Sequence, residues 1–309
     1  MRAVQACLDG LHRDARVAIG FSGGLDSAVL LDILAELCTG RAGLLSAIHV
    51  HHAISPHADA WTESCRAICA ARDVPLTVVR ISVPRDSSEG LEAAARRLRY
   101  QAFAAHPADH VLLAHHANDQ AETLLFNLLR GTGVRGAAGI PVRSGAAARY
   151  LRPLLACSRA ELESYAKAHA LQWVEDESNA DSAYSRNFIR HEVIPVLSRR
   201  FPAAVENLAR ATEHFAEAQA MLDEMAELDL GEYRAFPIPV SRLSALSHAR
   251  ARNALRYLLA LQGLQAPSSV RLEEVLRQFI EAAPDRHPSL ELPSYRLFRT
   301  RGMVAIELP

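Results

Sequence analysis

The first half of the chain alternates short apolar runs with amphipathic helical patterns, and no other feature constrains the fold as strongly. The apolar runs predict five strands, at 17–21, 44–51, 76–83, 110–114 and 150–155. Helical patterns follow them at 28–38, 61–71, 91–104, 118–130 and 159–168. Strands that alternate with helices form a parallel sheet covered by helices on both faces. We therefore predict an α/β domain built on a parallel five-stranded sheet.

The second half is expected to fold separately. Its helical patterns, the first of them long and acidic, occupy 206–228, 248–261 and 270–282. The last stretch, 295–308, alternates apolar and polar residues around a turn and predicts a hairpin. We place the boundary near residue 215, which gives a domain of 1–215 and a smaller, mainly helical domain of 216–309.

Composition excludes several classes of protein. The 309 residues include 34 basic and 35 acidic side chains, so the net charge of −1 favours neither a nucleic-acid nor a membrane partner, and any polyanion site must be local. Five cysteines without a CxxC pair argue against a disulfide framework, a zinc ribbon and an iron–sulfur cluster. No apolar run is long enough for a signal peptide or a membrane span, so we expect a cytoplasmic protein without a membrane partner.

One loop has the properties of a phosphate site. The only lysine is Lys167, so the Gly-Lys pair of a Walker A loop is absent. The segment 22–27 lies instead between the first strand and a helix, where two glycines let backbone amides approach a ligand and the helix N-terminus favours an anion. The candidate residues are Ser22, Gly23, Gly24, Leu25, Asp26 and Ser27. The carboxylate of Asp26 suits such a site if Mg²⁺ bridges it to phosphate. The alternative is a Gly-Gly turn with a helix cap.

Polar residues also follow the second and fourth predicted strands. His49 lies near the end of the second strand, and His115 and His116 follow the fourth, so all three histidines are expected at the edge where such sheets bind ligands. In the next helix, Asp119 and Glu122 are three residues apart and share a face. These carboxylates could hold Mg²⁺ or the amine of a cationic substrate. A zinc hydrolase and a capped helix with exposed acids are the alternatives.

Arginines concentrate in two segments, the polar face of the helix at 91–104 and the polar stretch 176–190 with the residues after it. In either segment they could contact phosphate or an RNA backbone. The alternatives are a solvated, salt-bridged helix face and a capped helix with a basic end. The candidates are Arg96, Arg99, Arg186, Arg190, Arg199 and Arg200.

Together these motifs resemble the tRNA(Ile)-lysidine synthases, which belong to the PP-loop superfamily of N-type ATP pyrophosphatases. The resemblance rests on the Ser-Gly-Gly-Leu-Asp-Ser loop and on the segments 49–52, 92–100, 115–122 and 176–190. It covers most of the first 200 residues, and the region after about residue 215 is similar to the family's first C-terminal domain. Many members continue into a second C-terminal domain, whereas this sequence ends at Pro309.

The resemblance implies a ligase that forms a carbon–nitrogen bond between free L-lysine and the wobble cytidine of tRNA(Ile) with a CAU anticodon. It also implies ATP and Mg²⁺. The cytidine O2 would attack the α-phosphorus, pyrophosphate would leave, and the lysine amine would then displace AMP. The catalytic domain would be 1–215, and 216–309 would help to bind tRNA. Assembly into a homodimer is also considered.

The family's roles carry over to the matching positions as hypotheses. The loop 22–27 and His49 would bind the nucleotide, Asp26 and Asp119 would hold Mg²⁺, and His115 would lie near the adenylate. Asp119 and Glu122 would bind Mg²⁺ or the lysine ammonium. The catalytic set would be Asp26, Arg96, His115, Asp119, Glu122 and Arg186, with Arg96 and Arg186 near the α-phosphoryl group. The tRNA contacts would be Arg99, Arg190, Arg199 and Arg200.

Two other functions are compatible with the loop. A PP-loop tRNA thiolation enzyme would share it, but it would need redox cysteines or an iron–sulfur cluster, which the cysteine spacing does not suit. A non-catalytic protein that senses ATP would bind the nucleotide and release nothing. Pyrophosphate release that requires both tRNA and lysine distinguishes the three.

Overall fold

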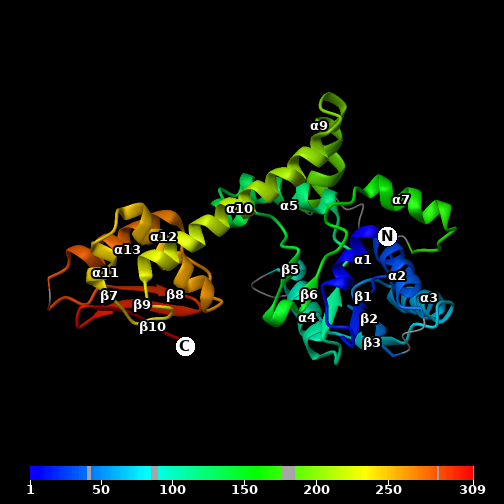
Figure 1. Cartoon of the computed structure of the whole chain (residues 1–309), viewed down its shortest axis with the longest axis horizontal. Helices are drawn as coiled ribbons and strands as arrows, with labels where there is room; N and C mark the ends of the chain where they lie inside the picture. The colour runs from blue at the N-terminus through cyan, green and yellow to red at the C-terminus, as the bar shows by residue number, and fades with distance from the viewer. Residues whose placement is uncertain (40–42, 85–89, 175–184, 284, 309) are drawn as a thin grey trace. The chain divides into compact units, whose positions relative to one another are not determined.

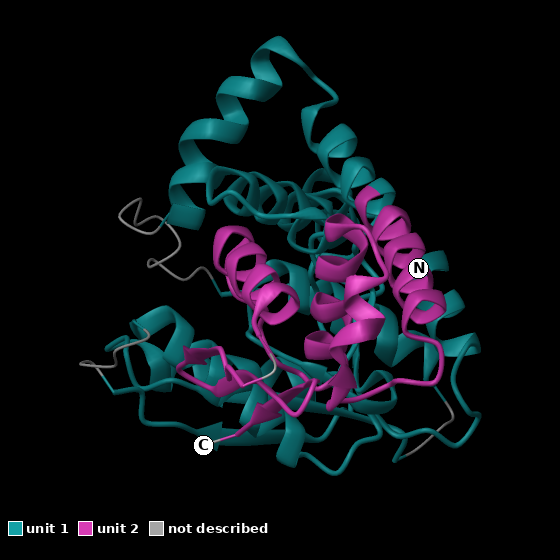
Figure 2. Ribbon diagram, turned by 90° about the vertical axis from the view of Figure 1, so that its left-hand side faces the viewer, with its two compact units in different colours: residues 1–214 teal, residues 215–309 magenta. Residues whose placement is uncertain are grey.

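The computed structural model describes residues 1–39, 43–84, 90–174, 185–283 and 285–308. The chain forms two compact units, Met1–His214 and Phe215–Pro309, which Figure 2 colours separately. The division falls within helix α10 (Ala204–Leu230), and each unit has its own hydrophobic core. Among the described residues, no helix is both long enough and apolar enough to cross a membrane.

Unit 1 contains a six-stranded sheet in the order β3-β2-β1-β4-β6-β5, whose strands other than β4 are labelled in Figure 1. Its strands are β1 (Val17–Gly20), β2 (Leu45–His51), β3 (Leu76–Arg80), β4 (His110–Leu112), β5 (Arg143–Ser144) and β6 (Tyr150–Leu151). All except β5 pair in parallel and lie at the five predicted positions. The predicted count of five is wrong by one, because β5 pairs antiparallel to β6 and is too short to leave a pattern in the sequence.

Alternate residues of the central strands face opposite helical layers, as expected for a sheet covered on both sides. Val17 and Ile19 of β1 face one layer, and Ala18 faces the other. The first layer consists of α1 (Arg2–Asp9), α2 (Leu25–Leu37), α3 (Ala58–Ala70) and α7 (Arg159–Ala168). The second includes α4 (Leu91–Ala105). Val17 and Ile19 are almost fully buried, and such burial stabilises the fold by roughly 1.5–3 kcal/mol per side chain.

The remainder of unit 1 is largely helical. Its elements are α5 (Ala117–Leu129), α6 (Val134–Ala137), a 3₁₀ turn (Ala146–Ala148), α8 (Ser185–Phe188), a π-helical turn (Ile189–Val193) and α9 (Ile194–Arg200). Ala121 of α5 packs against Ile189 and Ile194 in a small separate core. This packing brings the π-helical turn, which carries Arg190, against α5.

Unit 2 combines helices with a second sheet. After α10 come α11 (Val240–Ser244), α12 (His248–Leu261) and α13 (Ser269–Glu281). The strands are β7 (Ile238–Pro239), β8 (Ser289–Leu292), β9 (Tyr295–Thr300) and β10 (Met303–Glu307), in the antiparallel order β7-β10-β9-β8. Buried Tyr295, Leu297 and Val304 join the sheet to the helices. The hairpin predicted at 295–308 is β9–β10, whereas β7 and β8 were not predicted.

The arrangement of β2, β1 and β4 determines where a ligand can bind. These three parallel strands are neighbours, so the loops that follow them meet at one edge of the sheet. Ligands of open α/β sheets bind at this carboxyl edge. The loop after β1 and the histidines that follow β4 are therefore close in space.

Candidate functional site

The loop after β1 presents main-chain groups with little side-chain cover, because two glycines lie at its centre. Gly23 has a φ of +85°, a left-handed conformation that favours glycine, and Gly24 begins α2 without a side-chain cap. The hydroxyl oxygens of Ser22 and Ser27 are 3.0 Å apart, and the Ser27 hydroxyl donates to the Gly24 carbonyl at 2.9 Å. The first-turn amides of α2 lack partners within the helix and carry the positive end of its dipole. The loop can therefore hold a phosphate group without a lysine.

His49, which the sequence assigned to nucleotide binding, is buried beneath the loop. It is 7% exposed, and its Nδ1 donates to the Phe21 carbonyl at 2.9 Å. The Cys65 sulfur lies 3.6 Å from this nitrogen, and a Cβ atom added at Gly23 would come within 2.7 Å of the same sulfur. Burial lowers the pKa of His49 and raises the pKa of Cys65 to about 12. The geometry makes both residues neutral supports of the loop.

The main chain also ties the loop to a distant segment. The Val174 N–H donates to the Gly23 carbonyl at 2.9 Å. The Asp-Glu-Ser-Asn motif at 176–179 follows directly, but it lies outside the described residues, as do Asp181 and Tyr184. The loop is therefore hydrogen-bonded to the residue just before that part of the chain.

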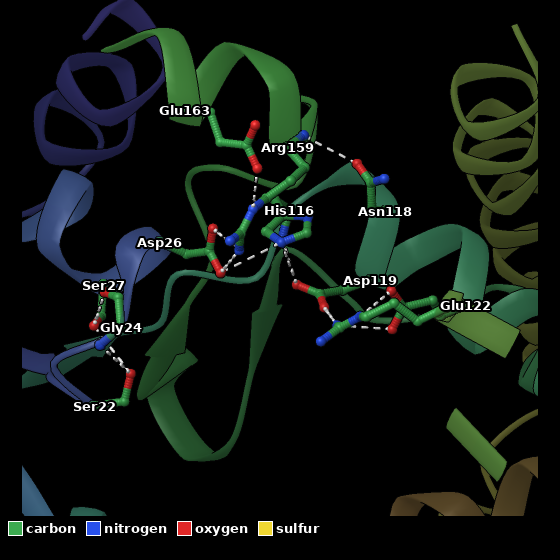
Figure 3. Close-up of polar contacts among 11 residues, drawn as sticks. Ser22, Gly24, Asp26, Ser27, His116, Asn118, Asp119, Glu122, Arg159 and Glu163 are labelled. Atoms are coloured by element: carbon green, nitrogen blue, oxygen red, sulfur yellow. Dashed lines mark hydrogen bonds and ion pairs between the residues drawn. The ribbon is translucent and has the colours of Figure 1, made fainter. Parts of the chain in front are cut away.

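Three acids and a histidine form what we call the acidic row: Asp26, His116, Asp119 and Glu122. The His116 Nε2 lies 3.5 Å from one oxygen of Asp26 and 3.6 Å from one oxygen of Asp119, so the imidazole stands between two carboxylates (Figure 3). The Asp119 carboxylate also accepts from the His116 N–H at 2.9 Å, at the start of α5. The row thus connects the phosphate loop at α2 with the acids of α5.

The charges of the acidic row control one another's protonation. Burial disfavours the charged form of His116, but the hydrogen bond to Asp26 and the two flanking carboxylates raise the pKa of His116. Burial also opposes the charge of Asp26, yet His116 and two arginines lower the pKa of that carboxyl. The arrangement therefore favours an imidazolium between two carboxylates.

Arg159 is the charged partner that sequence reasoning missed. Its Nη1 lies 2.8 and 2.7 Å from the two oxygens of Asp26, and its Nε donates to Glu163 at 3.1 Å. Arg159 is the first residue of α7, and its main-chain N–H donates to the Asn118 side-chain oxygen at 3.0 Å (Figure 3). An arginine in the first turn of a helix opposes the helix dipole, and this signal could have indicated a distant carboxylate partner.

Arg190 forms ion pairs with the two acids of α5 that belong to the acidic row. Its guanidinium donates to the two oxygens of Glu122 at 2.7 and 2.9 Å and to Asp119 at 3.1 Å. Burial raises the pKa of Glu122, although Arg190 opposes that shift. The sequence assigned Arg190 to tRNA contact, whereas the structure engages its guanidinium with these carboxylates. A cation therefore already fills the position expected for Mg²⁺ or an amine.

A second part of the site is a cavity of about 410 Å³, which we call the arginine cavity. Its described lining residues include Arg96, Arg152, Arg186, Tyr100 and Tyr150, and none of them is acidic. The structure thus brings Arg96 and Arg186, which are far apart in the sequence, to one cavity. Arg152 follows β6, in a segment where no sequence pattern indicated a site.

Charges from both the acidic row and the arginine cavity act on His115. Burial, together with the charges of Arg152 and Arg96, lowers its pKa to about 4, although Asp119 opposes the shift. Its Nδ1 is buried and has no hydrogen-bond partner among the described residues. At neutral pH His115 is therefore uncharged, whereas its neighbour His116 is held toward the charged form.

The remaining predicted arginines lie apart from these contacts. Arg99 is exposed on α4, and Arg199 and Arg200 are exposed at the end of α9. The Arg200 guanidinium lies 5.6 Å from the centre of the Phe201 ring. Their exposure leaves them accessible to an external polyanion, but the structure does not bring them to the acidic row.

Mg²⁺ would find hard oxygen donors in the acidic row. Asp26 and Asp119 present carboxylates on either side of His116, and Mg²⁺ commonly takes one or two carboxylates and completes its shell with phosphate oxygens and water. Within the ranges that the structure describes, no group of three metal-ligating side chains is assembled. These donors fit Mg²⁺ that arrives with phosphate, and they offer no three-ligand zinc site.

Known proteins resemble this chain over both units. Residues 2–197 match the PP-loop domain family, and residues 238–304 match the TilS substrate binding domain. A tRNA(Ile)-lysidine synthase of Alkalilimnicola ehrlichii is 48% identical, covering 93% of this chain and 65% of the relative. Those of Nitrosomonas europaea and Pseudomonas putida are 41% and 44% identical, covering 94% and 93% of this chain and 64% and 69% of the relatives.

The fold of unit 1 has a solved counterpart. The U34-tRNA thiolase NcsA from Methanococcus maripaludis, with its [4Fe-4S] cluster, matches with a TM-score of 0.56 at 17% identity, over 70% of this chain and 77% of that one. At this identity the likeness concerns the fold alone. The chain spans about two thirds of the length of the curated relatives. On these matches, the chain belongs to the PP-loop domain family and, within it, to the tRNA(Ile)-lysidine synthase family.

Proposed function

We propose that this chain ligates free L-lysine to the wobble cytidine of tRNA(Ile) with a CAU anticodon, as an ATP-consuming, cytoplasmic ligase. The observation that carries the proposal is the contact of Asp26 with His116 and, through His116, with Asp119. This contact joins a phosphate-binding loop to acids suited to an amine. The relatives named tRNA(Ile)-lysidine synthase support the choice of substrates.

The reaction has two steps. In the first, the cytidine O2 bonds to the α-phosphorus of ATP, the bond from that phosphorus to the bridging oxygen breaks, and pyrophosphate leaves. In the second, the lysine amine bonds to C2, the bond between C2 and O2 breaks, and AMP leaves with that oxygen while the nitrogen loses a proton. Both steps place negative charge on phosphate oxygens, so fixed cationic groups lower the barriers.

The loop 22–27 would bind the β and γ phosphates through its amides and hydroxyls. The carboxylate of Asp26 would repel the polyphosphate if it were unbalanced, and Arg159 and His116 balance it. Asp26 and Asp119 would hold Mg²⁺, which would neutralise phosphate charge. Unit 1 thereby supplies a nucleotide site in which each acid has a cationic neighbour.

Asp119 and Glu122 would receive the substrate amine. Arg190 supports this assignment, because its guanidinium already satisfies both carboxylates with N–H donors. Burial raises the pKa of Glu122, so this carboxylate would be suited to accept the proton that the attacking nitrogen loses. The substrate amine would have to displace Arg190 at least in part.

The arginines divide into two groups under this proposal. Arg96 and Arg186, which line the arginine cavity, would stabilise charge on the α-phosphoryl group. Exposed Arg99, Arg199 and Arg200 would contact the tRNA backbone. Unit 2 would contribute to tRNA binding, as its match to the TilS substrate binding domain supports.

Pyrophosphate release tests the proposal directly. The chain is incubated with Mg²⁺-ATP and with tRNA(Ile) transcript, tRNA(Met) transcript or neither, and each condition is run with and without lysine. Pyrophosphate and lysidine should appear together only with tRNA(Ile) and lysine over many turnovers. A requirement for a sulfur donor would indicate thiolation, and ATP binding without pyrophosphate release would indicate a sensor. Either result would refute the proposed ligase.

A further inference from the structure

Arg152 is buried and has no charged partner among the residues that the structure describes. It is 3% exposed, and its guanidinium donates to the Pro141 carbonyl at 2.8 Å, the Ser144 hydroxyl at 2.9 Å and the Tyr100 hydroxyl at 3.2 Å. All three acceptors are neutral oxygens. Its Nε is buried and has no hydrogen-bond partner among the described residues. Buried charges in folded proteins are normally paired, and the described residues supply no anion for this arginine.

The surroundings of Arg152 increase this imbalance. Arg96 and Arg186 line the same cavity of about 410 Å³, and none of its described lining residues is acidic. No ion pair joins any of the three arginines to a carboxylate in the described part of the chain. The Arg96 guanidinium lies 5.1 Å from the centre of the Tyr100 ring, so its closest aromatic contact adds no negative charge.

His115 provides a second, independent sign of a missing ligand. Its Nδ1 is buried without a hydrogen-bond partner among the described residues. Besides its burial, the charges of Arg152 and Arg96 act on the imidazole and help to lower its pKa. A neutral imidazole in this position can donate a hydrogen bond to an oxygen of an anion. Two unsatisfied buried nitrogens, one from Arg152 and one from His115, are therefore associated with the same arginine-rich region.

We propose that the arginine cavity is a phosphate subsite in which Arg152 is the buried anchor. A planar guanidinium matches the oxygens of a phosphate group, and three arginines match the charge of a phosphodiester or phosphoryl group better than that of a carboxylate. The cavity volume also lies in the range of small-molecule sites, and Tyr100 and Tyr150 offer aromatic surface to a nucleobase. The ligand is thus the phosphate of a nucleotide.

This inference deepens the proposed function and rests on it for the identity of the ligand. Two sources carry the same chemistry, a phosphodiester next to the wobble cytidine and the α-phosphoryl of ATP. Arg152, Arg96 and Asp119 all act electrostatically on His115, so the proposed subsite and the acidic row are coupled through this histidine.

Equilibrium binding by the Arg152→Gln variant tests the proposal. Arg149→Gln is the matched control, because Arg149 also donates to main-chain carbonyls, those of Phe103 and His106 among them, but does not line the cavity. Each protein is titrated with tRNA(Ile) transcript at several salt concentrations and, separately, with a non-hydrolysable ATP analogue and Mg²⁺. Circular dichroism and thermal melting verify the fold of each variant.

Arg152→Gln should lower the binding affinity for one of the two ligands about tenfold, as loss of one charge-assisted hydrogen-bonding group would. Arg149→Gln should leave both affinities unchanged. If the source is RNA, tRNA affinity falls and the slope of log K against log salt flattens by about one. If the source is ATP, the analogue binds more weakly and the tRNA slope is unchanged. Should Arg152→Gln fail to fold, Arg152→Lys takes its place and should show a smaller loss, since it keeps the charge without the planar fork.

Wild-type affinity for both ligands in a folded Arg152 variant would overturn the subsite. The proposed function fails separately, when the wild-type chain forms no lysidine. In that case a loss of tRNA or analogue affinity in Arg152→Gln would still support a phosphate subsite.

Discussion

The acidic row and the arginine cavity of unit 1 differ in the sign of their charged side chains. On the His116 side, the acids of the acidic row each have a cationic partner, either Arg159 or Arg190. The arginine cavity, two of whose arginines act electrostatically on His115, has three arginines and no acid among its described lining residues. The paired region is preorganised and already holds cations, whereas the described residues of the unpaired region supply no anion. Burial lowers the pKa of His115, and the charges of Arg152 and Arg96 add to that shift, whereas Asp26 and Asp119 raise the pKa of His116 against the effect of its burial.

The largest expected effect is the loss of catalysis when the paired region is broken. Asp119→Asn removes one carboxylate charge that contacts both His116 and Arg190. Lysidine formation should fall by on the order of 10²–10³-fold, as for other preorganised electrostatic groups. The measurement is the initial rate with tRNA(Ile) and lysine. Asp59→Asn, which changes an exposed carboxylate paired with Arg80, is the control. Near-normal turnover of Asp119→Asn would remove Asp119 from the mechanism.

The next effect is the separation of the two histidine titrations. Histidine-selective NMR should find His115 neutral down to about pH 4, while His116 keeps its proton above the ordinary value near 6.5. Arg152→Gln should raise the pKa of His115, and Asp26→Asn should lower the pKa of His116. Two histidines that titrate together near 6.5 would contradict the division of the site.

The pKa shifts of the two histidines should also change the pH dependence of the free energy of unfolding. The pKa of His115 is lower in the folded state, so stability should fall as pH drops from 6.5 toward 4. The pKa of His116 is raised, so its contribution is present below 6.5 and is lost as pH rises through the folded value. Gln substitutions should abolish each slope separately in denaturant titrations.

A smaller effect is expected from Arg159→Gln. Without this guanidinium, Asp26 would repel the phosphates of ATP more strongly. Binding of an ATP analogue should weaken roughly fivefold, because a half-exposed charge pair contributes about 1 kcal/mol. Arg72→Gln is the control. Arg72 pairs with Asp32, which lies on α2 like Asp26 but away from the phosphate loop. Equal affinities of the two variants would show that Arg159 only packs α7.

The smallest effect is expected at the exposed arginines. Arg199→Gln should weaken tRNA binding by only a few-fold and make the slope of log K against log salt less steep by about 0.9 at most. Arg66→Gln, an exposed arginine of α3 that pairs with Glu63, should leave the slope unchanged. An unchanged slope for Arg199→Gln would place the tRNA backbone elsewhere.

Residues on loops at the sheet edge were predictable, and their charge partners were not. Asp26, His116 and Asp119 follow strands or begin helices, so the alternation of elements assigns them to one edge of the sheet. Arg159 pairs with Asp26 across 133 positions, and only the docking of α7 on α2 makes that contact. Arg152 follows the two-residue strand β6, where no local pattern indicates a buried guanidinium.

His49 illustrates a different limit. The sequence located it correctly at the end of a strand, but strand position alone does not say whether a side chain faces the ligand or the interior. Its hydrogen bond to the Phe21 carbonyl shows that it faces the interior. The sheet of unit 2 was half predicted, because β7 has two residues and β8 has four, and runs this short carry little alternation from which to predict a strand.

The π-helical turn Ile189–Val193 sets the rotational phase of the segment that carries Arg190. Ile189 and Ile194 are five residues apart, yet both pack against Ala121. In a regular α-helix, positions five apart point about 140° away from each other, whereas the wider π-helical turn brings them to one side. The pairing of Arg190 with the acids of α5 therefore depends on register along the helix as well as on side-chain identity. A one-residue deletion within the turn would rotate the following helix by about 100° relative to α5 while leaving every side chain of the acidic row intact.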